Sequence, residues 1–226
     1  LPEFRPMLLR SAVSIFGSAV LAGCSVVGVR AGTEQPSYDV VSVVNDTVEI
    51  RQYGNRVAIQ TTVNRARRSV NENSAFDALA GYIFGKNRSQ SKIAMTSPVE
   101  MRAGSEKIAM TAPVERKTSG YGMTMRFFLP SGYTTDSAPL PLNPSVSVID
   151  VPPETIAALR FSGRRSTGNV AGHTAQLMNA LEGSPWQPAG EPTAFFYDPP
   201  WTVPTLRRNE VAVTVVPKND ELADER

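Results

Sequence analysis

Few residues of this chain have the types and spacing that catalysis needs. The 226 residues include one histidine, His173, and one cysteine, Cys24. Ser89 and Lys92 formally match the S-x-x-K spacing of β-lactamases, but the S-D-N element that accompanies it there is missing. The sequence has no P-loop, G-x-G-x-x-G or H-E-x-x-H motif, so nucleotide binding and zinc proteolysis lack support. We therefore treat the Ser89 match as a coincidence and predict a protein that is not an enzyme.

Cys24 stands in a context that favours lipid attachment. Arg5 and Arg10 flank Met7 and precede an apolar run at residues 11–21, and Leu-Ala-Gly immediately precedes the cysteine. These are the parts of a secretory signal, and the run is too short to span a bilayer as a helix. The L-A-G-C ending resembles the bacterial lipobox, whose cysteine is acylated. A free thiol after an ordinary signal peptide is the alternative.

The lipobox predicts how the chain is organised. We expect a signal peptide at residues 1–24, a tether at 25–37, a folded domain at 38–216 and a charged tail at 217–226. Acyl chains on Cys24 would anchor the protein in the bacterial cell envelope. Ser25 is not the aspartate that retains many Gram-negative lipoproteins at the inner membrane. The expected location is therefore the outer membrane, with the domain facing the periplasm.

One nine-residue phrase occurs twice near the middle of the chain. KIAMTSPVE at residues 92–100 and KIAMTAPVE at residues 107–115 share eight of nine letters. Each copy alternates apolar and polar residues, and Gly104 lies between them, so we predict two adjacent strands joined as a hairpin. Residues 123–129 alternate in the same way and predict a third strand. One sheet surface then carries four methionines: Met95, Met110, Met123 and Met125.

The segments before this phrase predict two strands and a helix. Residues 40–50 and 56–63 are rich in β-branched side chains, and Tyr53-Gly54-Asn55 between them indicates a hairpin. From Ala75 the apolar period changes to that of a helix, which Gly85 ends. The predicted apolar stripe of this helix consists of Phe76, Leu79, Ala80, Ile83 and Phe84.

The second half of the chain repeats this plan. Residues 145–151 and 155–161 predict two strands, and residues 169–181 predict a helix that ends at Gly183. Two closing strands are expected at residues 193–197 and 210–216. The repetition predicts an α+β fold: a pseudo-twofold, distorted antiparallel β-barrel with two flanking α-helices.

Five blocks of the sequence, in order, resemble the SOUL haem-binding protein family. They are the doubled KIAMTxPVE, GYIFGKN at 81–87, MRFFLPSGYT at 125–134, TIAALRFSG at 155–163 and PPWTVPTLRRNEVAV at 199–213. The likeness extends from about Tyr38 to Val216. It implies the same pseudo-twofold barrel and the binding of haem or another tetrapyrrole, with haem a possible cofactor that the fold does not require.

The resemblance also implies where the ligand lies. In this family it has been placed against the first helix, and the matching apolar positions are Phe76, Leu79, Ala80 and Ile83. Met95 and Met110 would face it from the sheet, either as a soft wall for a flat ligand or simply as adaptable core side chains.

Two further groups are candidates for holding haem. His173, near the start of the second helix, is a tentative iron ligand, and a purely structural histidine is the alternative. Family members differ in whether they possess a histidine ligand. Arg65, Arg67 and Arg68 are either a solvated strand end or grips for ligand carboxylates.

Three functions remain open from the sequence. The first is a membrane-tethered tetrapyrrole binder that buffers or carries haem without catalysis. The second is a general hydrophobic-ligand-binding or structural envelope lipoprotein on the same scaffold. The third is a hydrolase, which rests on Ser89 alone. The formal net charge of +2 gives no argument for a nucleic-acid partner.

Overall fold

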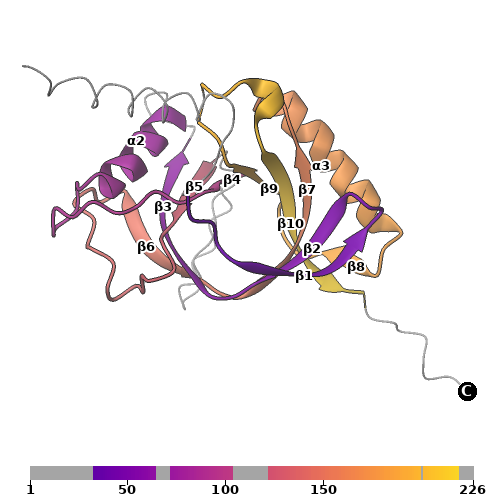
Figure 1. Ribbon diagram of the computed structural model, residues 1–226, viewed down its shortest axis with the longest axis horizontal. Helices are drawn as coiled ribbons and strands as arrows, with labels where there is room; N and C mark the ends of the chain where they lie inside the picture. Colours follow the sequence, from indigo (N-terminus) through magenta and orange to yellow (C-terminus); the bar gives the residue numbers. More distant parts are fainter. Residues whose placement is uncertain (1–32, 65–71, 104–121, 200, 219–226) are drawn as a thin grey trace, which may run out of the picture.

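A curled antiparallel sheet with two helices on its outer face makes up this protein (Figure 1). The computed structural model describes residues 33–64, 72–103, 122–199 and 201–218. The strand order is β1-β2-β7-β10-β9-β4-β5-β3-β6, and β8 pairs with β10 beside this path. β1 and β6 are the two edges, so among the described strands the sheet forms an open half-barrel.

Most of the elements lie close to the predicted ones. The strands are β1 Tyr38–Val44, β2 Val48–Tyr53, β3 Arg56–Asn64, β4 Val99–Ala103, β5 Gly122–Phe128, β6 Val146–Val151, β7 Glu154–Phe161, β8 Trp186–Pro188, β9 Thr193–Phe196 and β10 Asn209–Pro217. The helices are α2 Glu72–Ile83, α3 Thr167–Glu182 and the short 3-10 helix η1 Pro204–Leu206. No helix in the described part of the chain is long and apolar enough to cross a membrane.

The strand pairing confirms the predicted pseudo-twofold plan. The series β2-β3-α2-β4-β5 corresponds to β6-β7-α3-β9-β10. In the first half β5 pairs with both β3 and β4, and in the second β10 pairs with both β7 and β9. The halves join at the centre, where β4 pairs with β9. In addition, β2 of the first half pairs with β7 of the second, and β6 of the second half pairs with β3 of the first.

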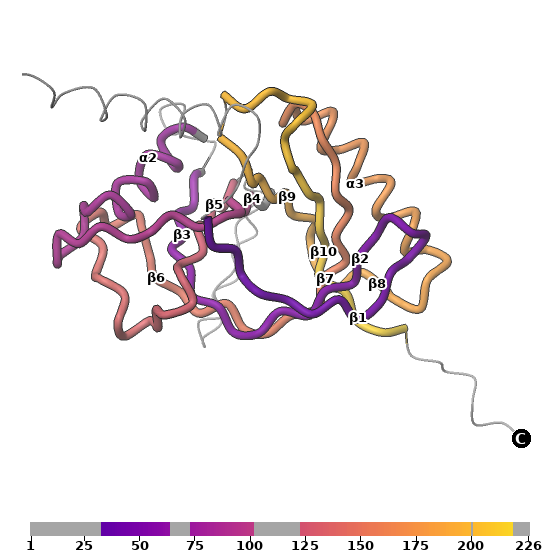
Figure 2. The backbone as a smooth tube through the Cα atoms, viewed as in Figure 1, coloured from indigo at the N-terminus to yellow at the C-terminus, as the bar shows by residue number. Residues whose placement is uncertain are grey.

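Each helix closes one of two cores on the outer face of the sheet. α2 packs on β3 and β5, while α3 packs on β7, β8 and β10, so the helices stand on opposite flanks (Figure 2). Leu79 and Ile83 of α2 meet Met125, and Leu177 and Leu181 of α3 are equally buried. Complete burial of a leucine contributes about 1.5–3 kcal/mol relative to an exposed one, so these positions fix both helices on the sheet.

The inner face of the sheet is also buried and forms a third core. It contains Phe128, Ile156, Phe195 and Tyr197. β5 illustrates the result: the predicted apolar positions Met123, Met125 and Phe127 face α2, yet the side chains between them are buried as well. The polar face expected from the alternation therefore lies inside the curl instead of in solvent.

The predicted hairpin at Tyr53-Gly54-Asn55 is wrong. β2 pairs with β1 and β7, whereas β3 pairs with β5 and β6, so Gly54 joins two strands that are not neighbours. The hairpin lies earlier, where Asn45 and Asp46 have φ of 50° and 55°. Asparagine and aspartate tolerate this left-handed region better than other side chains, and the turn splits the predicted strand 40–50 into β1 and β2.

The first copy of the doubled phrase is mostly not a strand. β4 begins only at Val99 and continues to Ala103, into the segment between the two copies that was predicted to be the hairpin loop. Pro98 has no N–H to donate to a ladder. The preceding backbone is used elsewhere, because Ile93 N donates to Ile83 O and Ser97 N donates to Glu34 O. The second copy, with Met110, lies outside the described residues.

The described end of the predicted tether contacts the domain. Glu34 accepts hydrogen bonds from the backbone N–H of Ser97 and, through its side chain, of Ser131. Gln35 Oε1 accepts from Arg208 Nη1 at 3.3 Å. Residues 34 and 35 are thus part of the folded unit, while Cys24 and the signal segment lie outside the described residues.

The end of α2 generates a test of the fold. Gly85 has φ of +103°, and Lys86 N donates to Gly81 O at 2.8 Å to close the predicted helix end. A Cβ at Gly85 would meet Gln90 O at 3.4 Å, whereas one at Gly172 in α3 meets nothing within 4 Å. We expect Gly85→Ala to lower the free energy of unfolding in urea by about 1–2 kcal/mol. Gly172→Ala should raise it by about 0.5–1 kcal/mol. Equal effects of the two substitutions would contradict this helix end.

Candidate functional site

Three of the predicted ligand-binding residues belong to the core beneath α2. Leu79 and Ile83 are 0% and 1% exposed, and Ala80 is buried beside them. The buried stripe also includes Ala75 and Tyr82, so it is rotated from the predicted one toward these residues. Side chains of the sheet already fill the space on which this stripe packs. A ligand cannot contact these three residues while the helix stays seated.

Two other predicted residues are accessible. Phe76 and Met95 are 39% and 40% exposed. Phe76 rests on the edge of the Phe127 ring, with the centroids 5.3 Å apart, so one side of it is fixed by packing. Met95 lies in the segment between α2 and β4. An aromatic ring and a thioether are both suited to contact a flat apolar molecule.

His173 lies apart from these residues. Its ring stacks on Phe161 of β7 at 4.2 Å, and its Nδ1 lies 2.8 Å from Asn169 O. Because a carbonyl only accepts, Nδ1 is the donor of this hydrogen bond. α3 packs on the other half of the sheet from α2, so the structure does not bring His173 to the helix that the family resemblance implicates. Arg65, Arg67 and Arg68 lie outside the described residues.

Ser89 serves a turn. Its hydroxyl lies 2.6 Å from Ser91 Oγ and 3.1 Å from Asn87 Oδ1. Asn87 is fully buried and donates to Tyr82 O and Ser91 O, which holds the turn against the end of α2. These contacts account for Ser89 without a catalytic role.

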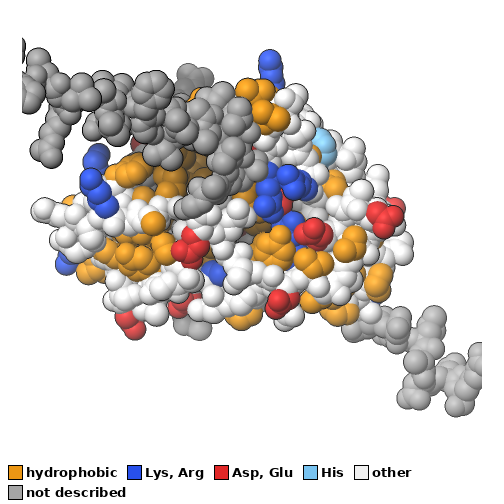
Figure 3. Space-filling view, in the orientation of Figure 1, with side chains coloured by type: hydrophobic (Ala, Val, Ile, Leu, Met, Phe, Trp, Pro, Cys, Tyr) orange, Lys and Arg blue, Asp and Glu red, His pale blue; other side chains and the backbone are white. Residues whose placement is uncertain are grey.

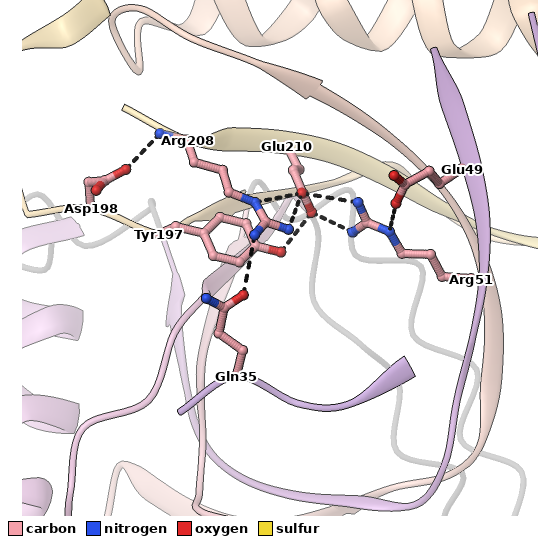
Figure 4. Close-up of polar contacts among 7 residues, drawn as sticks. All are labelled: Gln35, Glu49, Arg51, Tyr197, Asp198, Arg208 and Glu210. Atoms are coloured by element: carbon pink, nitrogen blue, oxygen red, sulfur yellow. Dashed lines mark hydrogen bonds and ion pairs between the residues drawn. The ribbon is translucent and has the colours of Figure 1, made fainter. Parts of the chain in front are cut away.

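A cluster of charged side chains on the inner face was not predicted. Glu210 of β10 is fully buried, and its carboxylate contacts two guanidinium groups and a phenol (Figure 4). Arg51 donates through Nη1 at 2.7 Å and Nη2 at 3.1 Å. Arg208 donates through Nε at 2.9 Å and Nη2 at 2.7 Å, and the Tyr197 hydroxyl donates at 2.7 Å. We call Glu210, Arg51, Arg208 and Tyr197 the Glu210 cluster.

The sheet order explains how the cluster forms. Arg51 lies on β2 and Glu210 on β10, with β7 between them. Ala158 of β7 is buried on the same inner face, and its single methyl group leaves room for the long side chain of Arg51 to cross. Arg51 also donates to Glu49 at 2.7 Å. Glu210 at the start of the mainly apolar strand β10 was the available sequence signal, but alternation alone does not tell an inner face from solvent.

The electrostatics of the cluster favour the ionised carboxylate. Burial opposes ionisation of Glu210, but the hydrogen bonds and charges of Arg51 and Arg208 outweigh it and lower the pKa of its carboxyl. Burial, and then the charge of Glu210, raise the pKa of the Tyr197 hydroxyl well above its usual value. The phenol therefore stays protonated and donates to the carboxylate.

A cavity of about 150 Å³ lies against this cluster. Its charged lining consists of Arg51, Arg160, Arg208 and Glu49, and Tyr38, Thr47 and Ala158 complete it. In Figure 3 basic and acidic side chains gather side by side near the middle of the visible face. We call this cavity the arginine pocket.

Breaking the Glu210 cluster generates the second test. We expect Glu210→Gln to lower the free energy of unfolding by about 3–5 kcal/mol, because it leaves buried arginines without their counter-charge. Glu49→Gln removes another partner of Arg51, but Glu49 is 42% exposed, and its loss should cost less than about 1 kcal/mol. Chemical denaturation of both variants measures the difference, and similar costs would contradict the assigned role of Glu210.

The lowered pKa of Glu210 sets the direction of the third test. The folded protein holds this carboxyl ionised, so its contribution to stability is present above the unfolded pKa of about 4.5 and is lost as the pH falls below it. The wild type should therefore lose more stability than Glu210→Gln as the pH is lowered from 5 through this range. Parallel pH profiles for the two proteins would show that the pKa of Glu210 is not lowered by folding.

Comparison with known proteins places this chain in a family. The sequence model described as SOUL heme-binding protein matches residues 33–214. No curated protein matches the chain. An uncharacterized conserved protein from Listeria innocua has a TM-score of 0.52 at 10% identity, over 82% of this chain and 94% of that one. A hydrolase from Listeria innocua gives 0.51 at 10%, over 83% and 94%.

A third solved structure is EcmrR in a complex with DNA, with a TM-score of 0.50 at 7% identity, over 76% of this chain. The chain spans 57% of the length of that protein. At such identities the solved structures show a shared fold alone. The family match covers most of the domain and all five sequence blocks, and on it rests the conclusion that this chain belongs to the SOUL haem-binding protein family.

Proposed function

We propose that this protein binds haem or another tetrapyrrole and buffers or carries it without catalysing a reaction. The observation that carries the proposal is the family match over residues 33–214. Haem has apolar faces and a carboxylate edge, so its site needs an apolar contact surface and, for tight ligation, a side-chain donor to the iron. Phe76, on the helix that the family implicates, and Met95, in the segment that follows this helix, supply two accessible apolar contacts.

The burial pattern supports a more specific proposal for the position of the ligand. Leu79, Ala80 and Ile83 lie on the buried face of α2, whereas Phe76 of the same helix is exposed. We infer that the tetrapyrrole lies against the outer flank of α2 and not beneath it. The residues there fit the flat face of the macrocycle. His173 does not fit as an iron ligand at this flank, because it lies on α3 over the other half of the sheet.

We further propose that a lipid on Cys24 anchors the protein in the bacterial envelope, most simply at the outer membrane. This part rests on the lipobox-like sequence. Residues 34 and 35 are fixed to the domain, and the nine residues 25–33 separate them from Cys24. Nine residues reach about 30 Å when extended, which keeps the domain close to the membrane surface.

A general hydrophobic-ligand-binding or structural role is the second candidate. One observation favours it: Met123 and Met125, which belong to the predicted methionine surface of the sheet, are core residues beneath α2. On this alternative any haem binding would be non-specific, through exposed aromatic side chains wherever they occur.

A haemin titration followed at the Soret band separates the two roles. We expect saturable binding that Phe76→Ala weakens about three- to tenfold, since one aromatic contact contributes about 0.5–1.5 kcal/mol. Trp201→Ala is the matched control, because Trp201 is an exposed aromatic between β9 and β10. It should change the affinity less than twofold. Equal weakening by both substitutions, or a band that does not saturate, would favour the second role.

The same titration tests the tentative role of His173. From the stacking on Phe161 we expect His173→Ala to leave the Soret maximum unchanged while lowering thermal stability. Loss of the red shift in this variant would instead identify His173 as the iron ligand and place the ligand at α3.

A further inference from the structure

The arginine pocket is a built cavity that the tetrapyrrole site does not use. It opens on the inner face, between β1, β2 and β7, whereas α2 covers the outer face of the other half of the sheet. Its volume of about 150 Å³ is that of a cavity able to hold a molecule as small as benzene, well below the range for drug-sized ligands. The polar side chains of its lining exclude a purely apolar guest.

Two of its guanidinium groups are held in place before any ligand arrives. Glu210 forms ion pairs with both Arg51 and Arg208. Arg51 also lies over the Tyr38 ring at 4.5 Å, and Arg208 lies over the Tyr197 ring at 4.0 Å. Side chains that are already ordered lose little conformational entropy when they bind, which favours a specific anion contact over a diffuse one.

The third guanidinium group is available. Arg160 stands opposite Glu210 in the β7–β10 register, but its side chain is exposed. It forms no ion pair or side-chain hydrogen bond with any other residue of the described chain. A guanidinium group presents its donors in a planar fork that matches a carboxylate.

The charges of the pocket favour a singly charged guest. Arg51, Arg160 and Arg208 carry three positive charges, and Glu49 and Glu210 carry two negative ones. Asp198 lies beyond Arg208, where its carboxylate accepts the backbone N–H of that residue, and it is not part of the lining. One positive charge is left over.

We propose that the arginine pocket binds a small monocarboxylate, with its carboxylate on Arg160 and Arg208. One carboxylate neutralises the surplus charge, whereas a phosphate dianion would exceed it. The site is separate from the proposed tetrapyrrole site, so both ligands can be bound at once. If the monocarboxylate proposal fails, the tetrapyrrole proposal is unaffected.

Calorimetric titration of the full chain with sodium acetate tests this proposal. Acetate should bind saturably and more tightly than inorganic phosphate. Arg160→Gln should weaken acetate binding at least about tenfold, because a hydrogen bond to a charged group contributes about 1.5–3 kcal/mol. Arg164→Gln makes the same charge change at an exposed position outside the pocket and should alter the affinity less than twofold.

Several outcomes would overturn the proposal. They are the absence of saturable acetate binding, equal weakening by Arg160→Gln and Arg164→Gln, and tighter binding of phosphate than of acetate. Competition between acetate and haemin would also overturn it, since the pocket would then hold a carboxylate of the tetrapyrrole itself. Because Arg160 is exposed, an unchanged circular dichroism spectrum of Arg160→Gln is expected and establishes that the variant is folded.

Discussion

The buried carboxylate of Glu210 requires compensation by opposite charge, and much of the inner face is arranged to supply it. A carboxylate removed from water costs several kcal/mol unless it is paired and hydrogen-bonded. Arg51 reaches it across β7, Arg208 from the segment before β10, and Tyr197 from the end of β9. The cluster thus joins strands on both sides of β10, namely β2 and β9. Arg208 also contacts Gln35, which links the cluster to the segment before β1.

The same principle extends along the inner face toward the other half of the sheet. Arg126 of β5 donates to Gln60 and lies 3.4 Å from the carboxylate of Glu100, and all three side chains are buried. Because paired charges and aromatic rings fill the inner face while helices cover the outer one, the sheet has little apolar surface free for a large ligand. This arrangement is the reason for proposing that a tetrapyrrole binds at a flank and that the polar pocket on the inner face takes a small charged molecule.

Local sequence signals predicted the elements well, and tertiary pairing explains where they failed. The apolar period that predicted α3 and the glycine that predicted the end of α2 are signals within a short stretch of sequence. The helix and the helix end were both confirmed. The partner of a strand depends on residues far along the chain, which is why Gly54 was misread as a hairpin turn. Alternation in β5 was read correctly, but not the burial of its polar face. For the same reason no pattern near Glu210 identified Arg51, 159 residues away, as its partner.

The central proposal is that the tetrapyrrole binds on the outer flank of α2 while this helix stays packed on the sheet. Family membership, the buried core beneath α2 and the exposure of Phe76 and Met95 support it. Methyl NMR of the seven methionines during addition of a diamagnetic zinc porphyrin tests it most directly. The account predicts ring-current shifts for the methyl group of Met95 and none for the buried Met125. Shifts at Met125, which require α2 to lift from the sheet, or no shift at Met95, would contradict it.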